Sequence, residues 1–444
     1  MVSIVLSTYN RAGTLKMSVD SILQQTYEDF ELIIVDDGST DCTKELLEEY
    51  TDKRIRLFSL KENQFYCMAA NYGLQQVKGE YVAFATSDDL WKKDKLELQI
   101  NYLEKRKECG ACFTFSTVID ENGENAKEKF NMLSGLLVKN FYTQKDWIQH
   151  FIFEGNCLSH PSAVIRKEVL DKVGNFNLLY CQSADMDLWL RIVRYYPIHV
   201  IDKELVNYRC YKNPNDQISG ADELKAARFL NEHMIIRRKF IQDLSDGEMI
   251  KFFGDCFRNK DAGSHLELEI EKAFLLMNCT KGLPNFRIMG IEKFEELLRN
   301  PEVVLILRKK YNVKLQDIYQ WNLEHFYMDF GIHVRLAEQD RKVLVLREQL
   351  QKEKEYTQGL QRFRSELQEN LQHAQSRIQE QEKELERRNK CIEEIKEKVI
   401  KTELCLTVKE KELREEKEEH KNTVSLLEEV LLEKLKIQEE RRKR

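Results

Sequence analysis

The sequence lacks an excess of charge of either sign. Lys and Arg total 70 and Asp and Glu total 76, so the formal net charge is −6 over 444 residues. A protein that binds nucleic acid usually carries a strongly basic face, and the overall charge gives no indication of such a partner. No run reaches the ~18 consecutive apolar residues that are typical of a membrane-spanning helix, so we expect no membrane span.

The sequence also lacks a paired cysteine framework. Its eleven cysteines are odd in number and scattered, mostly in apolar or helical contexts. This usage is typical of reduced thiols in a cytosol rather than of disulfides. Cys109 and Cys112 form a lone CxxC with no second pair to complete a zinc site, so buried thiols and a metal or redox pair both remain open there.

Because the first predicted strand is residues 2–7, we expect no signal peptide before it. We therefore expect a cytoplasmic protein, with attachment at the inner face of a membrane left open. The four basic residues 441–444 are too few to predict contact with anionic lipid by themselves.

The N-terminal part of the sequence alternates short apolar runs with stretches of helical spacing. Strands separated by about 10–15 helical residues predict βαβ units. Such units give an α/β fold with a mostly parallel mixed sheet and helices on both faces. The predicted strands are residues 2–7, 30–35, 54–59 and 81–85, and the predicted helices are residues 14–25, 43–50 and 66–77.

Polar residues follow three of these strands where each strand ends. They are Thr8-Tyr9-Asn10, Asp36-Asp37-Gly38-Ser39 and Thr86-Ser87-Asp88-Asp89. Right-handed crossovers place these strand ends along one edge of the sheet, where open α/β sheets bind ligands. Paired carboxylates such as Asp88 and Asp89 suit Mg²⁺ or Mn²⁺. The alternative is structural, because each group can also serve as a turn residue or a helix N-cap.

Longer motifs surround these strand ends. They are Ser3-Ile-Val-Leu-Ser-Thr-Tyr-Asn10, Ser21-Ile-Leu-Gln-Gln-Thr-Tyr27, Phe30-Glu-Leu-Ile-Ile-Val-Asp-Asp-Gly-Ser39 and Gly79-Glu-Tyr-Val-Ala-Phe84, followed further on by His160-Pro-Ser-Ala-Val164, Gly174-Asn-Phe176 and Ala184-Asp-Met-Asp-Leu-Trp-Leu-Arg191. In order, spacing and wording they resemble the family 2 glycosyltransferases, which have a nucleotide-sugar-binding α/β fold of the A type. The resemblance covers residues 1–220.

This resemblance implies transfer of a sugar from a nucleoside diphosphate sugar to a hydroxyl group, with inversion at the anomeric carbon. Asp37 corresponds to the residue that reads a uracil, and Tyr9 lies beside the base. Asp88 corresponds to the metal-binding carboxylate, with Asp89 adjacent, so Mn²⁺ or Mg²⁺ is the expected cofactor. Asp185 corresponds to the catalytic base. Further contacts with the nucleotide sugar are expected from Ser7, Thr8, Asn63 and Ser87.

Elementary chemistry agrees with these roles. A carboxylate-held divalent cation neutralises a departing diphosphate, and one general base suffices for a single in-line displacement. The alternative for Asp185 is structural, as the N-cap or a first-turn acid of the helix that follows it. Asp187, about 200° further round that helix, is the competing base. We expect Leu188 and Trp189 to pack inside and Arg191 to pair with an acid.

Three positions depart from the family's pattern. Thr86 stands where the family usually has a further acid, and Ala70, before Asn71, stands where it often has Arg. Tyr211 stands where a His can complete the metal shell. Because Tyr is a poor ligand for a hard divalent ion at neutral pH, water or diphosphate oxygens would fill that place.

Residues 221–334 lack strand alternation and carry helical spacing, for example at Leu266, Ile270 and Phe274. We expect a helical accessory domain over this range, after a catalytic domain of residues 1–220. Several further residues are interpreted as core residues, with acceptor binding as the alternative. They are His265, Cys279, Tyr319, Trp321, Phe326 and Tyr327.

The last part of the sequence, residues 335–444, is dominated by Glu, Lys, Gln and Arg and contains no Pro. A heptad register starting at Leu346 (position d) and Leu350 (position a) gives seven consecutive apolar a positions, from Leu371 to Leu413. This pattern predicts a long helix that forms a coiled coil, through which copies of the chain would join into a homo-oligomer. The d positions are mostly polar, so an isolated helix held by i,i+4 ion pairs is the alternative.

Two readings of function follow from these patterns. The first is a glycosyltransferase that acts on a cell-surface glycan or glycoconjugate. The second is a sugar-nucleotide-binding scaffold whose coiled coil assembles a glycan-synthesis complex, which Thr86 and Tyr211 favour. A nucleotidyltransferase is disfavoured because no Gly-rich phosphate loop with a basic residue follows the first strand.

Overall fold

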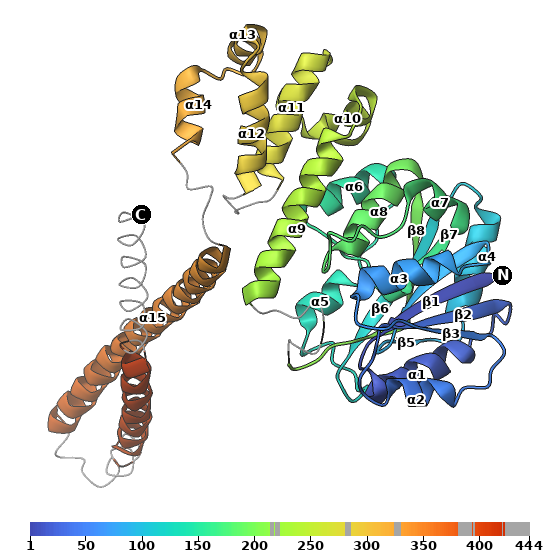
Figure 1. Cartoon of the computed structure of the whole chain (residues 1–444). Coiled ribbons are helices and arrows are strands. Elements are labelled where there is room, and N and C mark those ends of the chain that lie inside the picture. The colour runs from blue at the N-terminus through green and yellow to red at the C-terminus, as the bar shows by residue number, and fades with distance from the viewer. Residues whose placement is uncertain are drawn as a thin grey trace, which may run out of the picture. The chain divides into compact units, whose positions relative to one another are not determined.

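The computed structural model describes residues 1–213, 217, 223–279, 286–323, 330–380, 393, 396–419 and 421. The chain divides into two compact units, Met1–Gly331 and Ile332–Arg444, and each is described by itself. Figure 1 labels their helices and strands.

The first unit is built on an eight-stranded sheet with strand order β3-β2-β1-β4-β7-β6-β8-β5 (Figure 1). Its first half is parallel and contains the four strands that the sequence predicts. They are β1 (Val2–Thr8), β2 (Phe30–Asp36), β3 (Ile55–Ser59) and β4 (Tyr81–Thr86). Their continuous apolar runs are typical of strands that are covered on both faces.

The second half of the sheet is mixed. It consists of β5 (Leu90–Trp91), β6 (Ala111–Ile119), β7 (Val164–Arg166) and β8 (Ile198–Arg209). Strand β7 is antiparallel to both β4 and β6. Strand β8 is parallel to β6, with register shifts around Phe115, and antiparallel to β5. Because β5 pairs with β8, the chain just after Asp89 lies beside the end of β8.

Helices cover both faces of the sheet because strand side chains alternate between two cores. Ile4 and Leu6 of β1 enter one core with α1 (Ala12–Leu23), α2 (Thr43–Glu48) and α4 (Lys95–Lys105). Val5 enters the other core. The helices of that core include α3 (Tyr66–Gln75), α6 (Gln144–Phe153), α7 (Lys167–Val173) and α8 (Ala184–Tyr195). The predicted fold class, a mostly parallel mixed sheet with helices on both faces, is confirmed.

Two shorter helical elements lie between these: α5 (Asn131–Leu136) and the 3₁₀ turn η1 (His160–Ser162). After β8 the described chain is helical, as the sequence predicts. The elements are α9 (Glu223–Gln242), α10 (Asp246–Phe253), η3 (Gly254–Cys256), α11 (His265–Asn278), α12 (Arg287–Leu297), α13 (Pro301–Lys310) and α14 (Leu315–Trp321). Ile236 and Ile241 of α9 lie in the same core as Trp189 of α8. The domain boundary between residues 220 and 221 stays a prediction.

The residues interpreted as core residues of the helical part fare differently. Cys279 is fully buried, and Trp321 packs against the core around Phe274. His265 is exposed and the side chain of Tyr319 is 62% exposed, so for these two the interpretation is wrong: both lie on outward faces of their helices. Phe326 and Tyr327 lie outside the described residues.

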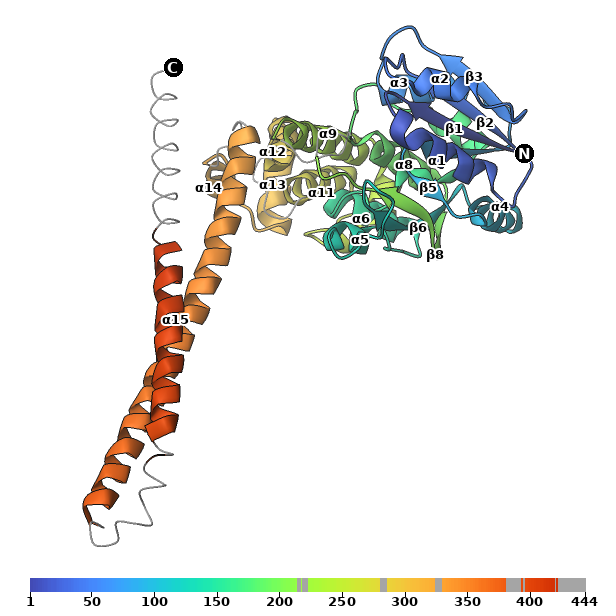
Figure 2. The same cartoon turned by 90° about the horizontal axis from the view of Figure 1, so that it is seen from below.

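Helix α15 (Phe330–Glu380) begins with the last two residues of the first unit, and the second unit contains the rest of it and a further helical stretch, residues 396–419. The two lie side by side and run antiparallel (Figure 2). The Lys409 ammonium nitrogen lies 4.3 Å from the ring centroid of Tyr356, and Leu350 and Leu413 line the same groove. The partly buried side chains of both stretches fall on the predicted a and d positions, for example Leu346, Leu360, Leu367, Val399 and Leu406. A coiled coil between copies stays a prediction.

Two expectations from composition can be compared with the described residues. Among the described helices, none combines the length and the apolar content needed to cross a membrane. The described cysteines are free thiols, and Cys109 and Cys112 are both buried.

Candidate active site

The carboxyl ends of β1, β2 and β4 open into a cavity of about 410 Å³. Every site residue that the sequence predicts lines it. They are Ser7, Thr8, Tyr9, Asp37, Asn63, Ser87, Asp88, Asp89 and Asp185. Parallel strands carry most of these residues to one sheet edge, while Asp185 arrives from the start of α8. The structure therefore brings all nine together.

Five buried side-chain atoms of residues that line this cavity have no hydrogen-bond partner among the described residues. They are the hydroxyl oxygens of Ser7 and Thr8, the side-chain oxygen of Gln182, Nδ1 of His160 and one terminal nitrogen of the Arg209 guanidinium. Buried polar atoms in folded proteins are nearly always hydrogen-bonded. These five atoms are therefore available to a polar ligand that enters the cavity.

Asp37 lies where the turn after β2 meets the segment that leads into α3. One oxygen of its carboxylate accepts a 2.8 Å hydrogen bond from the backbone N–H of Gln64, and burial raises its pKa. Gly38 allows this approach because its φ is +71°, and a Cβ there would lie 2.7 Å from the backbone of Glu62. The turn thus holds Asp37 at the cavity wall with one carboxylate oxygen accepting from the backbone.

Tyr9 lies at the rim of the cavity and is 39% exposed. The next residue, Asn10, has a left-handed backbone with φ of 51°, which Asn tolerates better than most residues. Its backbone N–H donates to the Ser39 hydroxyl (2.9 Å), and its side-chain oxygen accepts from the Thr40 N–H (2.8 Å). The end of β1 is therefore tied to the turn after β2.

The carboxylates of Asp88 and Asp89 differ in the hydrogen bonds that they accept. One oxygen of Asp89 accepts from the Arg209 backbone N–H (2.7 Å), and the other accepts from the Thr86 hydroxyl (2.5 Å). Asp88 accepts a longer bond, 3.3 Å, from the Tyr211 hydroxyl. Burial raises the pKa of both carboxyls. Asp88 is thus the better candidate for a metal ligand, because both oxygens of Asp89 already accept hydrogen bonds from Arg209 and Thr86.

The structural alternative for this pair, a helix N-cap, is not observed. The residues after Asp89 form strand β5 rather than a helix, and the N-cap of α4 is Asp94. The two carboxylates therefore end a strand without starting a helix.

Tyr211 and Arg11 complete this corner of the cavity. Burial, and then the charge of Asp88, raises the pKa of Tyr211 to about 12. The guanidinium carbon of Arg11 lies 5.5 Å from the centroid of the Tyr211 ring. At neutral pH Tyr211 is therefore a neutral hydrogen-bond donor to Asp88 rather than a phenolate ligand.

Asp185 faces the cavity from the first turn of α8. One carboxylate oxygen accepts from the Met186 backbone N–H (2.7 Å), and the other accepts from the Asn156 side-chain amide (2.8 Å). Burial, and to a smaller extent the charge of Glu232, raises the pKa of Asp185 to about 7. A carboxylate with a pKa near neutrality is suited to take a proton as a general base.

The neighbours of Asp185 on α8 are placed as the sequence predicts. Leu188 and Trp189 are fully buried. Arg191 pairs with Asp187 at 2.7 Å, and its guanidinium also donates to the carbonyl oxygen of Val173. Because Asp187 is occupied by this ion pair and does not line the cavity, it is the weaker candidate for a base.

Other cavity residues had no role predicted from the sequence. His160 and Tyr66 share a 2.5 Å hydrogen bond, and the ring of His160 stacks on Phe84. Arg209 donates to the Asp88 carbonyl oxygen (2.8 Å). Phe65 is 69% exposed and has a φ of 66°, a strained value for a bulky residue. The His160-Pro motif was a usable signal for the first pair, but the sequence gives none for Phe65.

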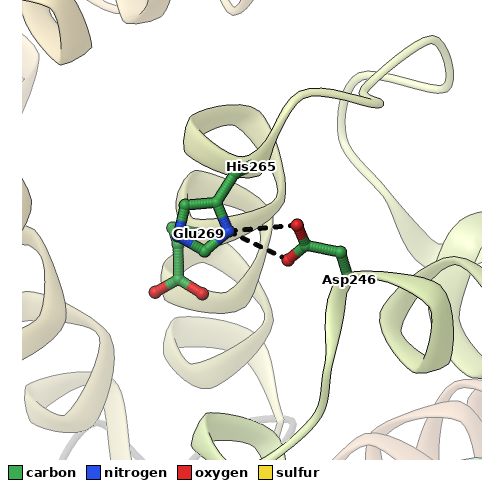
Figure 3. A group of neighbouring side chains, drawn as sticks. All are labelled: Asp246, His265 and Glu269. Atoms are coloured by element: carbon green, nitrogen blue, oxygen red, sulfur yellow. Dashed lines mark hydrogen bonds and ion pairs between the residues drawn. The ribbon is translucent and has the colours of Figure 1, made fainter.

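A second group of potential metal ligands lies among the described residues but outside the cavity (Figure 3). Both carboxylate oxygens of Asp246 lie 3.1 Å from Nδ1 of His265, and Glu269 is one turn further along α11. Its carboxylate oxygens lie 2.8 and 2.7 Å from the ammonium groups of Lys272 and Lys293. Because two cations already neutralise Glu269, the group is best explained as an ion-pair network.

Comparison with known proteins identifies a matching family model and several similar glycosyltransferases. The family model described as glycosyl transferase family 2 matches residues 3–174. The Escherichia coli protein UDP-Glc:alpha-D-GlcNAc-diphosphoundecaprenol beta-1,3-glucosyltransferase WfaP is 31% identical over 206 residues, which is 44% of this chain and 70% of that protein. The chain spans less than half the length of other relatives, namely 40% and 41% of two uncharacterized Rickettsia glycosyltransferases and 49% of the putative teichuronic acid biosynthesis glycosyltransferase TuaG of Bacillus subtilis.

Solved structures also show similarity. S. aureus TarS 1-349 in complex with UDP is 19% identical, with 72% of this chain and 88% of that chain covered and a TM-score of 0.43. The mannosyltransferase PcManGT from Pyrobaculum calidifontis, in complex with GDP-Man and Mn2+, is 18% identical, with 72% and 84% covered and a TM-score of 0.42.

Proposed function

Because the chain belongs to glycosyl transferase family 2, we propose that it transfers a sugar from a nucleoside diphosphate sugar to a hydroxyl group, with inversion. The donor is a UDP-sugar that carries a hexosyl or N-acetylhexosaminyl group. The acceptor is a cell-surface glycan or glycoconjugate. The observation that carries the proposal is the single cavity that gathers Asp37, Asp88 and Asp185.

The nucleotide occupies the end of the cavity formed by β1 and β2. Asp37 accepts from the imide N–H of the uracil with the oxygen that Gln64 does not engage, and Tyr9 packs on the ring from the rim. Ser7, Thr8 and Asn63, and Ser87 after β4, line the same cavity. The unpartnered hydroxyls of Ser7 and Thr8 support this placement, because ribose and phosphate oxygens would satisfy them.

The residues of the β4 end fit a divalent cation. Asp88 is half-buried and Asp89 is buried. Burial raises the pKa of both carboxyls, and the charge of Asp88 raises that of Asp89 further. A cation would relieve this cost. Asp88 would hold Mn²⁺ or Mg²⁺ directly, and Asp89 would support it while bonded to Thr86 and Arg209. When bound, the ion supplies charge neutralisation for the departing diphosphate.

Asp185 acts as the general base in a single displacement. The acceptor O–H gives its proton to the carboxylate of Asp185 while its oxygen forms a bond to the anomeric carbon. The bond from that carbon to the diphosphate oxygen breaks, and UDP leaves with the electron pair. The pKa of Asp185, raised to about 7, suits this role near neutral pH.

The acceptor class and the location are further parts of the proposal. The printed acceptor of WfaP is a sugar on diphosphoundecaprenol, and we extend this class of lipid-linked glycoconjugate to the present chain. The protein then works in the cytoplasm, at the inner face of the membrane. The tail joins copies into a homo-oligomer through its coiled coil.

The test incubates the purified full chain with UDP-glucose, UDP-N-acetylglucosamine and other nucleotide sugars in the presence of Mn²⁺. The measured quantity is the nucleoside diphosphate that is released. We expect turnover of at least one donor and a loss of about 100-fold or more for Asp88→Ala, the scale for removing a group that stabilises leaving-group charge. Asp94→Ala, an acid outside the cavity at the start of α4, is the matched control. Donor binding without any turnover would favour the scaffold reading.

A further inference from the structure

A buried carboxylate from α9 holds the segment that leads into α8. Glu232 is only 4% exposed. Its two oxygens accept from three consecutive backbone N–H groups, those of Cys181 (2.7 Å), Gln182 (2.9 Å) and Ser183 (2.7 Å). Glu232 lies beyond the residues that the family model matches, 3–174, and beyond the predicted catalytic domain.

These three donors are at a place that needs partners. The first N–H groups of a helix and of the residues just before it have no partner within the helix. The N-cap Ser183 makes no side-chain cap bond here. A carboxylate at this end is also favoured by the helix dipole. Glu232 therefore accepts hydrogen bonds from the backbone N–H groups at the start of α8, as an N-cap side chain usually does, although it belongs to another helix, α9.

We propose that Glu232 is a positioning residue that fixes the N-terminus of α8 and thereby aims Asp185 into the cavity. This inference rests on the proposed function, in which Asp185 is the base. Asp185 is only two residues beyond Ser183, and Gln182 itself lines the cavity. A shift of this backbone would move both side chains together. The helix that carries Glu232 packs in the same core as α8, so the carboxylate is held rigidly.

The charge of Glu232 has a second effect on Asp185. Other groups near Asp185 are neutral at pH 7 or occupied. Burial raises the pKa of Tyr66 well above its usual value, raises that of Cys67 to about 12 and lowers that of His160 to about 3. Asp187 is paired with Arg191, and Arg228 donates to the sulfur of Cys181. Among the described groups, Glu232 is thus the charge that makes Asp185 a stronger base.

The test replaces Glu232 by Gln, which keeps the size but removes the charge and one acceptor. The acidic limb of kcat/KM, which rises as Asp185 loses its proton, should move to lower pH by about half a unit or more. The plateau value of kcat should fall about 10-fold. The affinity for UDP, measured by calorimetry, should stay within about 2-fold, because the nucleotide end of the cavity is not touched.

Glu248→Gln is the matched control. Glu248 also braces α8 from a neighbouring helix, through a 2.7 Å pair with Arg194 at the other end of α8. Its loss should lower stability without moving the pH limb. A Glu232→Gln profile identical to that of the wild type, or a limb that moves equally in both variants, would overturn the proposal.

A second variant keeps the test decisive if Glu232→Gln does not fold. Glu232→Asp retains the charge but withdraws the carboxylate by one methylene, so it should lower kcat and leave the pH limb near its wild-type position. An unchanged kcat in this variant would refute the positioning role. Failure of the wild type itself to turn over any donor is a different outcome, because it refutes the proposed function rather than the role of Glu232.

Discussion

At the scale of single residues, the cavity holds four carboxylates whose pKa is raised because burial disfavours the charged form. They are Asp37, Asp88, Asp89 and Asp185. A raised pKa means that the folded protein binds these protons more tightly than the unfolded chain does. Each of the four therefore lowers stability as the pH rises through its folded pKa. Such a cost is typical of functional sites, and a bound cation would offset it.

Asp185→Asn should make the protein more stable at pH 8. Asp185 contributes stability below its unfolded pKa, near 3.8, and that contribution is lost as the pH rises through about 7. Because one pKa unit corresponds to about 1.4 kcal/mol, the free energy of unfolding should rise by roughly 1 kcal/mol or more at pH 8. Urea unfolding from pH 4 to 8 measures this. A difference that does not shrink toward pH 4 would contradict the assignment.

Tyr211→His should strengthen metal binding. The phenol is a neutral donor to Asp88 at 3.3 Å, whereas an imidazole can ligate Mn²⁺ directly. We expect the Kd for Mn²⁺ to fall about 10-fold, on the scale that changes at metal sites usually have. Titration of the protein with Mn²⁺, followed by electron paramagnetic resonance, gives the constant. Tyr211→Phe is the control, and an equal affinity in all three proteins would argue against a metal beside Asp88.

The sequence indicated the strand-end residues but not their supports. Asp37 and Asp88 end apolar runs, and that local pattern suffices to place them at the sheet edge. Arg209 and Glu232 were missed because they act on residues far away in the chain: Arg209 is 120 positions from Asp89, and Glu232 is 49 positions from Ser183. No local pattern marks an acceptor or donor whose partner is so distant.

At the scale of elements, the parallel half of the sheet supplies only part of the site. Strand β8 adds Arg209, and helix α8 adds Asp185. The four parallel strands were predictable because strands covered on both faces have continuous apolar runs. The second half was not. Strand β7 has three residues and β5 has two, and β8 changes register against β6. Such short or shifted strands leave no periodic pattern, although β8 carries Arg209 to the Asp88 loop.

The loop before α8 is also held from α3. The amide of Asn71 donates to the Phe176 carbonyl oxygen (2.8 Å) and accepts from the Phe176 N–H (3.0 Å). Asn71→Ala leaves both backbone groups without these partners, so we expect a loss of about 2 kcal/mol of stability and a lower kcat. Thermal unfolding and UDP release measure the two effects. An unchanged kcat would show that this end of the loop does not affect Asp185.

At the scale of the whole molecule, the chain divides into two compact units. Unit Met1–Gly331 contains the complete cavity. In the other unit, the predicted heptad seam is used within the chain, between α15 and residues 396–419. A second apolar stripe on the stretch 396–419, Ile400, Leu404 and Val408, is 52 to 66% exposed. We expect copies of the chain to associate through this stripe.

A chain that ends at Gly331 should sediment as a monomer, whereas the full chain should sediment as an oligomer. Leu404→Glu should reduce the sedimenting mass of the full chain toward that of the monomer, because burying a charge between helices without a partner is costly. Lys401→Glu, on the polar side of the same helix, is the control. The shortened chain should still release UDP from the donor. Equal monomer masses for the full and the shortened chain would refute the predicted oligomer.

The central claim is that the cavity performs transfer with Asp185 as its base. The most direct measurement compares the rate of UDP release by the wild type and by Asp185→Asn at pH 8, together with their affinities for UDP. We expect the rate to fall about 100-fold or more while the affinity for UDP stays unchanged. A variant that releases UDP at the wild-type rate would contradict the claim.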